Sequence, residues 1–367
     1  MKIKSAFAIL PLILMIVFSA CDREKPVVVT PDTEVIVIKD NAQITNKPES
    51  ITEKQISDKT EVGSPFTSVW YPYWDYDTAD RELELIGDDL DTICFFAAYY
   101  DVNGEPFIPQ DTQETFSKLN NSGKLDKKHT YLTFVNDKLL EKGSSLKDTD
   151  LLYDLLGNAD LADRHADDII KLAKDFGCEG IEIDYEAIKK DRKLWQHFYE
   201  FVNVLCEKAQ KESIPVRVVF EPSAPITEYD WPGYPEYVMM CYNLNGYGTK
   251  AGPKADIAWI KELCEKMKTL KGQPNMAFAG GGFDFSDDGS VSQIDYCLAE
   301  QIRTDKQADV QRDENSGALY FSYTDENATD HQIWYADQET IRIWIQTAKD
   351  CGIDRVSIWR LGGNINE

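Results

Sequence analysis

GCEGIEIDYEAI, residues 177–188, contains four acidic side chains, and three of them alternate with apolar residues in a run that is otherwise typical of a buried strand. Side chains alternate between the faces of a strand, so Glu182, Asp184 and Glu186 share one face while Ile183 and Tyr185 share the other. Buried carboxylates are costly unless they are paired or perform chemistry. The pattern therefore predicts either an acidic functional site or a structural feature, namely a water-facing strand edge or a salt-bridge cluster.

Short apolar runs rich in β-branched and aromatic residues alternate with amphipathic helical stretches over most of the chain. Helices are expected at 160–177, 191–211 and 337–352. This alternation predicts an α/β fold, a (β/α)8 TIM barrel, with a small α+β insertion at 283–337 after strand seven. A doubly wound open sheet is the alternative, which the lack of G-x-G-x-x-G after the first run disfavours. Strands are expected at 67–74, 91–100, 129–137, 178–186, 214–223, 236–243, 275–285 and 354–363.

Composition restricts the partners of this 367-residue chain. Its formal net charge of -25 argues against nucleic acid, because phosphate backbones are bound by basic side chains, and is compatible with neutral sugars or with a role in solubility alone. Seven cysteines beyond residue 21 are scattered without a C-x-x-C pair, which predicts free thiols and no zinc site. We expect neither a metal nor a cofactor.

The N-terminus has the proportions of a bacterial leader. A basic start and the apolar core AFAILPLILMIVF precede FSAC, which resembles a lipobox in which Cys21 is lipidated. An ordinary cleaved signal is the alternative. The expected organisation is a signal peptide at 1–20, a flexible tether at 21–62 and a barrel domain at 63–367. It predicts a monomer anchored to the cell membrane or surface by lipid, on the extracytoplasmic side.

EGIEIDYE (179–186) resembles the D-G-x-D-x-D-x-E signature of family 18 glycoside hydrolases, with Glu in place of the first two Asp. VMMCYNLNGYG (238–248) resembles the M-x-Y-D motif of that family's sixth strand, with Asn in place of Asp. Further segments resemble the spore-cortex-lytic N-acetylglucosaminidase branch in the same order along the chain. They are DVNGEP (101–106), GPKADIAWI (252–260), GGGFDF (280–285), HQIWYADQETIRIW (331–344) and VSIWRLGG (356–363).

The resemblance implies substrate-assisted retaining catalysis, in which the acetamido oxygen of the substrate attacks C1. Glu186 would be the general acid/base, Asp184 would orient the acetamide N–H, and Tyr242 would hold its carbonyl. Glu182 would tune Asp184, and a shared proton between neighbouring carboxylates is one way to do so.

Four further residues are expected to bind substrate: Asn243, Trp359, Tyr71 and Phe96. Trp359 would form the floor of the sugar site, while Asn243 would contact either substrate or a loop. Tyr71, with Tyr73 and Trp74, would stack sugars or pack the barrel rim.

The resemblance implies a hydrolase of β-1,4-linked N-acetylglucosamine glycans, with peptidoglycan, chitin-type chains and the N-glycan core all left open. The partner is then a GlcNAc-containing oligosaccharide or polysaccharide. The alternative is a catalytically weak or inactive lectin-like surface lipoprotein, which the departures at Glu182 and Asn243 keep open.

Overall fold

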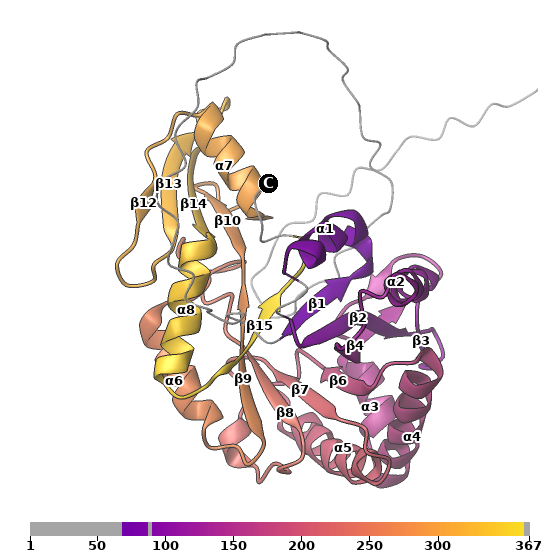
Figure 1. Cartoon of the computed structure of the whole chain (residues 1–367). Helices are drawn as coiled ribbons and strands as arrows, with labels where there is room; N and C mark the ends of the chain where they lie inside the picture. The colour runs from indigo at the N-terminus through magenta and orange to yellow at the C-terminus, as the bar shows by residue number, and fades with distance from the viewer. Residues whose placement is uncertain (1–67, 87–89, 363–367) are drawn as a thin grey trace, which may run out of the picture.

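The computed structural model describes residues 68–86 and 90–362 (Figure 1). The predicted leader, tether and lipidated Cys21 lie outside these residues. Within the described ranges, no helix combines the length and the apolar character needed to cross a membrane.

Eight parallel strands close into a barrel, because β1 pairs with β2 on one side and with β15 on the other, and β2 also pairs with β4. This arrangement confirms the predicted TIM barrel and excludes an open sheet. The strands are β1 (Ser68–Pro72), β2 (Thr92–Tyr100), β4 (His129–Leu139), β6 (Gly180–Asp184), β7 (Val216–Phe220), β8 (Glu236–Met240), β9 (Gln273–Ala279) and β15 (Arg355–Trp359). Two short strands, β3 (Pro106–Phe107) and β5 (Ser144–Ser145), extend β2 and β4 as antiparallel hairpins.

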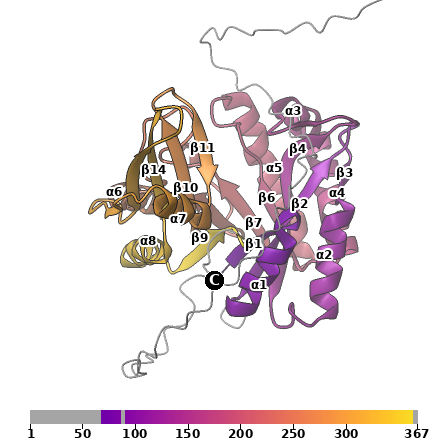
Figure 2. The same ribbon diagram turned by 90° about the horizontal axis from the view of Figure 1, so that it is seen from above.

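Helices surround the barrel, as seen from above in Figure 2. The three predicted helices are present as α4, α5 and α8, and β7 is joined to β8 through a 3-10 turn, η3 (Ile226–Glu228). α4 begins where the side chain of Asn158 accepts a hydrogen bond from the Leu161 amide, and it ends at Gly177 with φ 99°. The helices are α1 (Tyr76–Ile86), α2 (Gln110–Asn121), α3 (Thr149–Leu156), α4 (Ala159–Phe176), α5 (Arg192–Lys211), α6 (Ile257–Met267) and α8 (Gln338–Asp350).

The alternation in β6 separates two kinds of core. Ile181, Ile183 and Tyr185 belong to the main apolar core, together with residues of α4 and α5. Glu182 and Asp184 point the other way, into the barrel, and both are buried. Because the covering helices pack against the apolar face of β6, its acidic face points into the barrel.

The predicted insertion follows β9 and stands beside the barrel (Figure 1). The run at 275–285 was expected as one strand, but it is divided between β9 of the barrel and β10 of the insertion. The chain changes sheets at glycines: Gly281 has φ 61°, and a Cβ on Gly282 would lie 1.8 Å from the Trp334 carbonyl oxygen. The insertion comprises β10 (Gly281–Ser286), β11 (Val291–Ile294), α7 (Tyr296–Asp305), β12 (Gln311–Arg312), β13 (Leu319–Thr324) and β14 (Asp330–Ala336).

The insertion sheet has the order β11-β10-β14-β13-β12, and β13 and β14 form an antiparallel hairpin. α7 covers one face, where Ala299 packs with Phe321, Ile333 and Tyr335. The seven cysteines in the described residues are free thiols, as predicted, and five of them are buried.

Candidate active site

Glu186 lies just beyond the carboxyl end of β6, at the mouth of the barrel. Asn136 of β4 fixes its backbone, because the Asn136 Oδ1 accepts from the Glu186 amide at 2.8 Å and its Nδ2 donates to the Glu186 carbonyl at 3.1 Å. The Glu186 side chain is 22% exposed, and its Oε2 accepts from Lys147 Nζ at 2.8 Å. Burial raises the pKa of Glu186, although the Lys147 ammonium partly offsets this effect.

Asp184 is the most isolated of the three acids. It is buried, and its Oδ1 has no hydrogen-bond partner among the described residues. Burial raises the pKa of Asp184 well above its usual range, and the negative charges of Glu186 and Glu182 raise it further. The protonated form is therefore favoured relative to a solvent-exposed aspartate, and one oxygen of Asp184 has no partner among the described residues.

Glu182 is fully buried and accepts four hydrogen bonds. Its Oε1 receives Trp70 Nε1 at 2.6 Å and Thr133 Oγ1 at 2.7 Å. Its Oε2 receives Arg217 Nε at 2.8 Å and Cys94 Sγ at 3.6 Å. Because these donors occupy the whole carboxylate, a shared proton with Asp184 is disfavoured, and Glu182 acts on Asp184 through its charge.

Arg217 connects Glu182 to a wider buried network. Its guanidinium, 1% exposed, also donates through Nη1 to Glu236 Oε1 at 2.7 Å. Glu236 in turn accepts from Asn275 Nδ2 at 2.6 Å and pairs with Arg355 Nη2 at 2.9 Å. The salt-bridge alternative raised by the sequence thus describes Glu182, while Asp184 and Glu186 lie outside this network and remain the candidate functional pair.

Aromatic side chains line the interior beside these acids. The Trp359 ring lies 4.9 Å from that of Phe96 and 5.7 Å from that of Trp70, centroid to centroid. Tyr242, at the end of β8, packs into the same cluster. Burial raises the pKa of its phenol, and the charge of Asp184 raises it further. The structure therefore brings Tyr242, Trp359 and Phe96 together in one cluster with Trp70, whose indole donates to Glu182.

Tyr71 requires a correction. It is 1% exposed and packs on the outer side of β1 against Phe95 and Tyr76, at centroid distances of 6.0 and 6.4 Å. Its hydroxyl donates to the Tyr76 carbonyl at 3.3 Å. The alternation of β1 turns Trp70 inward and Tyr71 outward, so Tyr71 does not face the barrel mouth. Trp74, 45% exposed and 5.7 Å from the Phe96 ring, is the rim aromatic that a sugar can reach.

Asn243 is exposed and has φ 62°. Asn is among the few residues other than Gly that tolerate this left-handed backbone. The turn itself therefore explains an Asn at this position, and the side chain remains available to a ligand.

Sequence reasoning missed two cations. Arg217 carried a signal, since it interrupts the apolar run IPVRVVF on an alternating face. Lys147 carried none: it lies in a loop with φ 51°, where its amide donates to Asp137 Oδ1 at 2.7 Å. Burial opposes its charge, yet Glu186 raises the pKa of Lys147 overall. Within the described ranges, no group of three or more His, Cys, Asp or Glu side chains is arranged to hold a metal ion.

A family model described as glycosyl hydrolases family 18 matches residues 69–364. The uncharacterized glycosylase YvbX of Bacillus subtilis (strain 168) is 27% identical over 231 residues, which are 59% of this chain and 66% of YvbX. The chain spans 66% and 53% of the lengths of two Bacillus relatives that it matches.

Two solved structures share the fold. The Bacillus cereus spore cortex-lytic enzyme SleL has a TM-score of 0.68 and 17% identity, covering 82% of this chain and 71% of SleL. A class V chitinase from Nicotiana tobaccum in complex with NAG4 has a TM-score of 0.62 and 12% identity, covering 82% of this chain and 95% of the chitinase. At these identities the likeness establishes the fold alone.

Proposed function

Because the chain belongs to the glycosyl hydrolases of family 18, we propose that it cleaves β-1,4-linked N-acetylglucosamine glycans, with Glu186 as general acid/base. The observation that carries this proposal is the buried Oδ1 of Asp184, which lies next to Glu186 and has no hydrogen-bond partner within residues 68–86 and 90–362. An acetamide N–H is a ligand group that would satisfy this oxygen, and the aromatic floor at Trp359 suits the apolar face of a sugar ring.

The proposed reaction is substrate-assisted, as in other family 18 enzymes. The acetamido oxygen bonds to C1 while the bond from C1 to the leaving oxygen breaks, and Glu186 gives its proton to that oxygen. Asp184 accepts the acetamide N–H, and the Tyr242 hydroxyl donates to the acetamide carbonyl. Lys147 stabilises the Glu186 carboxylate that remains. Water then attacks C1, the bond from C1 to the acetamido oxygen breaks, and the Glu186 carboxylate takes the proton of that water.

A lectin-like role is the second candidate, and one contact favours it. The ion pair between Glu186 Oε2 and Lys147 Nζ, 2.8 Å long, stabilises the ionised form that cannot act as an acid. A chain in which this pair persisted with substrate bound would hold glycans without cleaving them.

We propose further that Cys21 carries a lipid that holds the barrel at the extracytoplasmic side of a membrane, and that the protein is a monomer. The motif FSAC and the apolar leader support the anchor. Mass spectrometry of the mature N-terminus tests it: an acylated Cys21 is expected, and an unmodified mature chain would contradict it.

Product analysis by mass spectrometry tests the activity. The purified full chain is incubated with chitooligosaccharides, peptidoglycan or a high-mannose glycopeptide, beside the Glu186→Gln variant. Cleavage of one substrate class that the variant loses is expected, and it would identify the glycan. Binding without cleavage by the unaltered chain would instead favour the lectin-like role.

A further inference from the structure

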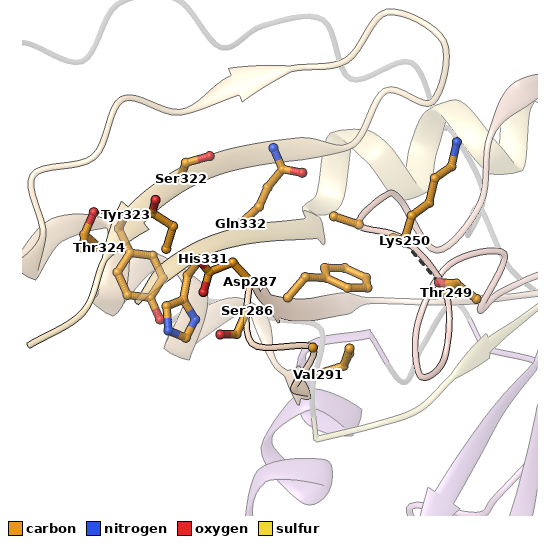
Figure 3. A pocket seen from close by; sticks show the side chains of 14 residues that line it. Thr249, Lys250, Ser286, Asp287, Val291, Ser322, Tyr323, Thr324, His331 and Gln332 are labelled. Carbon is orange, nitrogen blue, oxygen red and sulfur yellow. Dashed lines mark hydrogen bonds between the residues drawn. The ribbon is translucent and has the colours of Figure 1, made fainter. Parts of the chain in front are cut away.

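One face of the insertion sheet is not covered by α7. Cross-strand pairing aligns Phe285 of β10 with Gln332 of β14 and Ser322 of β13, so these side chains form a row on one face. Their neighbours in sequence, such as Ile333 and Phe321, face α7 instead. Figure 3 shows Ser322 and Gln332 on one side of the strands and Tyr323 and His331 on the other.

A second row on the uncovered face is aromatic. Phe283, Trp334 and Tyr320 are aligned in the same register, and the Tyr320 and Trp334 rings stack at 4.5 Å with an angle of 14°. Both rings of this stack are half-buried, so part of their surface remains accessible to solvent.

A cavity of about 680 Å³ includes the first row in its lining and extends to Tyr323 and His331, whose side chains lie on the opposite side of the strands. Its floor includes Phe285, Ser322 and Gln332, and residues 249–251 of the loop after β8 form another part of its lining (Figure 3). This volume falls within the usual range for small-molecule sites. None of its lining residues comes from a barrel strand, and none is one of the acids or aromatic residues of the candidate active site.

Gln332 is held ready to donate. Its Oε1 accepts from Trp334 Nε1 at 2.9 Å, which fixes the orientation of the amide and directs its two N–H groups away from the indole. The Ser322 hydroxyl lies beside it on an exposed strand position. Neutral amide and hydroxyl groups beside aromatic rings suit a ligand with hydroxyl groups on an apolar frame.

Charge argues against an anionic ligand. The acids Asp287 and Asp330 line the cavity together with Lys250, and the Asp330 Oδ1 accepts from Thr324 Oγ1 at 2.8 Å. His331 is already paired with Asp284, at 2.9 Å from Nδ1 to Oδ1. Acids outnumber the lysine here, so phosphate-rich or acidic ligands would be repelled.

We propose that this face of the insertion is a second glycan-binding site, which holds a neutral GlcNAc-containing chain away from the catalytic mouth. The choice of ligand class rests on the proposed function. The site would keep an insoluble glycan close to the barrel between cleavage events, adding avidity without new catalytic contacts.

Calorimetric titration of the full chain with chitohexaose tests this inference, in a Glu186→Gln background that prevents cleavage. Two sugar molecules per chain are expected. Ser322→Arg, which fills the cavity from an exposed strand position, should reduce this to one. Ser292→Arg is the matched control, since Ser292 is also exposed on the same sheet but does not line the cavity.

Gln332→Ala provides a second test that adds no bulk, and it should also remove one binding event. A stoichiometry of one sugar molecule per chain that neither Ser322→Arg nor Gln332→Ala changes would overturn the second site. An equal loss of binding in Ser292→Arg would overturn it as well. In the unaltered background, Ser322→Arg should retain the rate on chitotriose, because the barrel mouth is untouched. If no glycan is cleaved but binding that depends on Ser322 persists, the proposed hydrolase fails while the second site stands.

Discussion

Replacing Arg217 by Met should destabilise the protein strongly, in a way that depends on pH. The substitution removes the ion pairs to Glu182 and Glu236, at 2.8 and 2.7 Å, from a site where the guanidinium is 1% exposed. Glu236 keeps Arg355 and Asn275 as partners, so Glu182 is the carboxylate left without a cation. Breaking a buried pair by removing one partner costs about 3–5 kcal/mol in free energy of unfolding at neutral pH.

The sign of the pH dependence follows from linkage. An uncompensated Glu182 in the variant has its folded-state pKa raised above the unfolded value, so the folded state binds an extra proton at low pH. The loss in free energy of unfolding is therefore smallest at low pH. It should grow as pH rises above the unfolded pKa, by up to about 1.4 kcal/mol per pH unit for one proton, and level off above the folded pKa.

Urea unfolding followed by tryptophan fluorescence at pH 5 and pH 8 measures both quantities. Arg342→Met is the matched control, because Arg342 is 67% exposed and pairs with Glu339 at the surface, and it should change stability by less than about 0.5 kcal/mol. Adding Glu182→Gln to Arg217→Met should restore part of the loss at pH 8. A loss below about 1 kcal/mol at pH 8, or one equal at both pH values, would refute the reasoning.

Three further results are expected. Lys147→Met removes the cation that lowers the pKa of Glu186, so the limb of the kcat–pH profile that reports loss of the Glu186 proton should move to higher pH. Lys142→Met, at an exposed position nearby in the chain, is the control, and an unmoved limb in Lys147→Met would count against this contact. Asp184→Asn should abolish cleavage yet raise the free energy of unfolding at pH 8 more than at pH 5 in urea titrations. The buried acid's raised folded-state pKa makes the native protein lose stability as pH rises, so equal changes at both pH values would contradict this assignment. Tyr71→Phe should leave kcat/KM unchanged, since its hydroxyl meets only a backbone carbonyl on the outer side of β1, and a tenfold loss would restore Tyr71 to the site.

Local patterns in the chain were enough to predict the barrel and its acidic face. One arrangement agrees with both the period-two alternation at 178–186 and the amphipathic helices around it. In that arrangement Ile181 and Ile183 face outward, towards the helices, and Glu182 and Asp184 face into the barrel. The same pattern failed at Tyr71, because an aromatic residue suits both a sugar site and the layer between barrel and helices. Only the register of β1 with its neighbours assigns it to that layer.

The sequence by itself determined the succession of strands and helices along the chain, the alternation within β6 and the position of Glu186 after β6, because each depends on residues close together in the chain. Tertiary structure alone decided which acid is neutralised and which is left exposed to a ligand. Arg217 lies 35 residues from Glu182, and Lys147 lies 39 residues from Glu186. Such pairings form only when the barrel closes and burial makes charge compensation necessary, so no local pattern contains them.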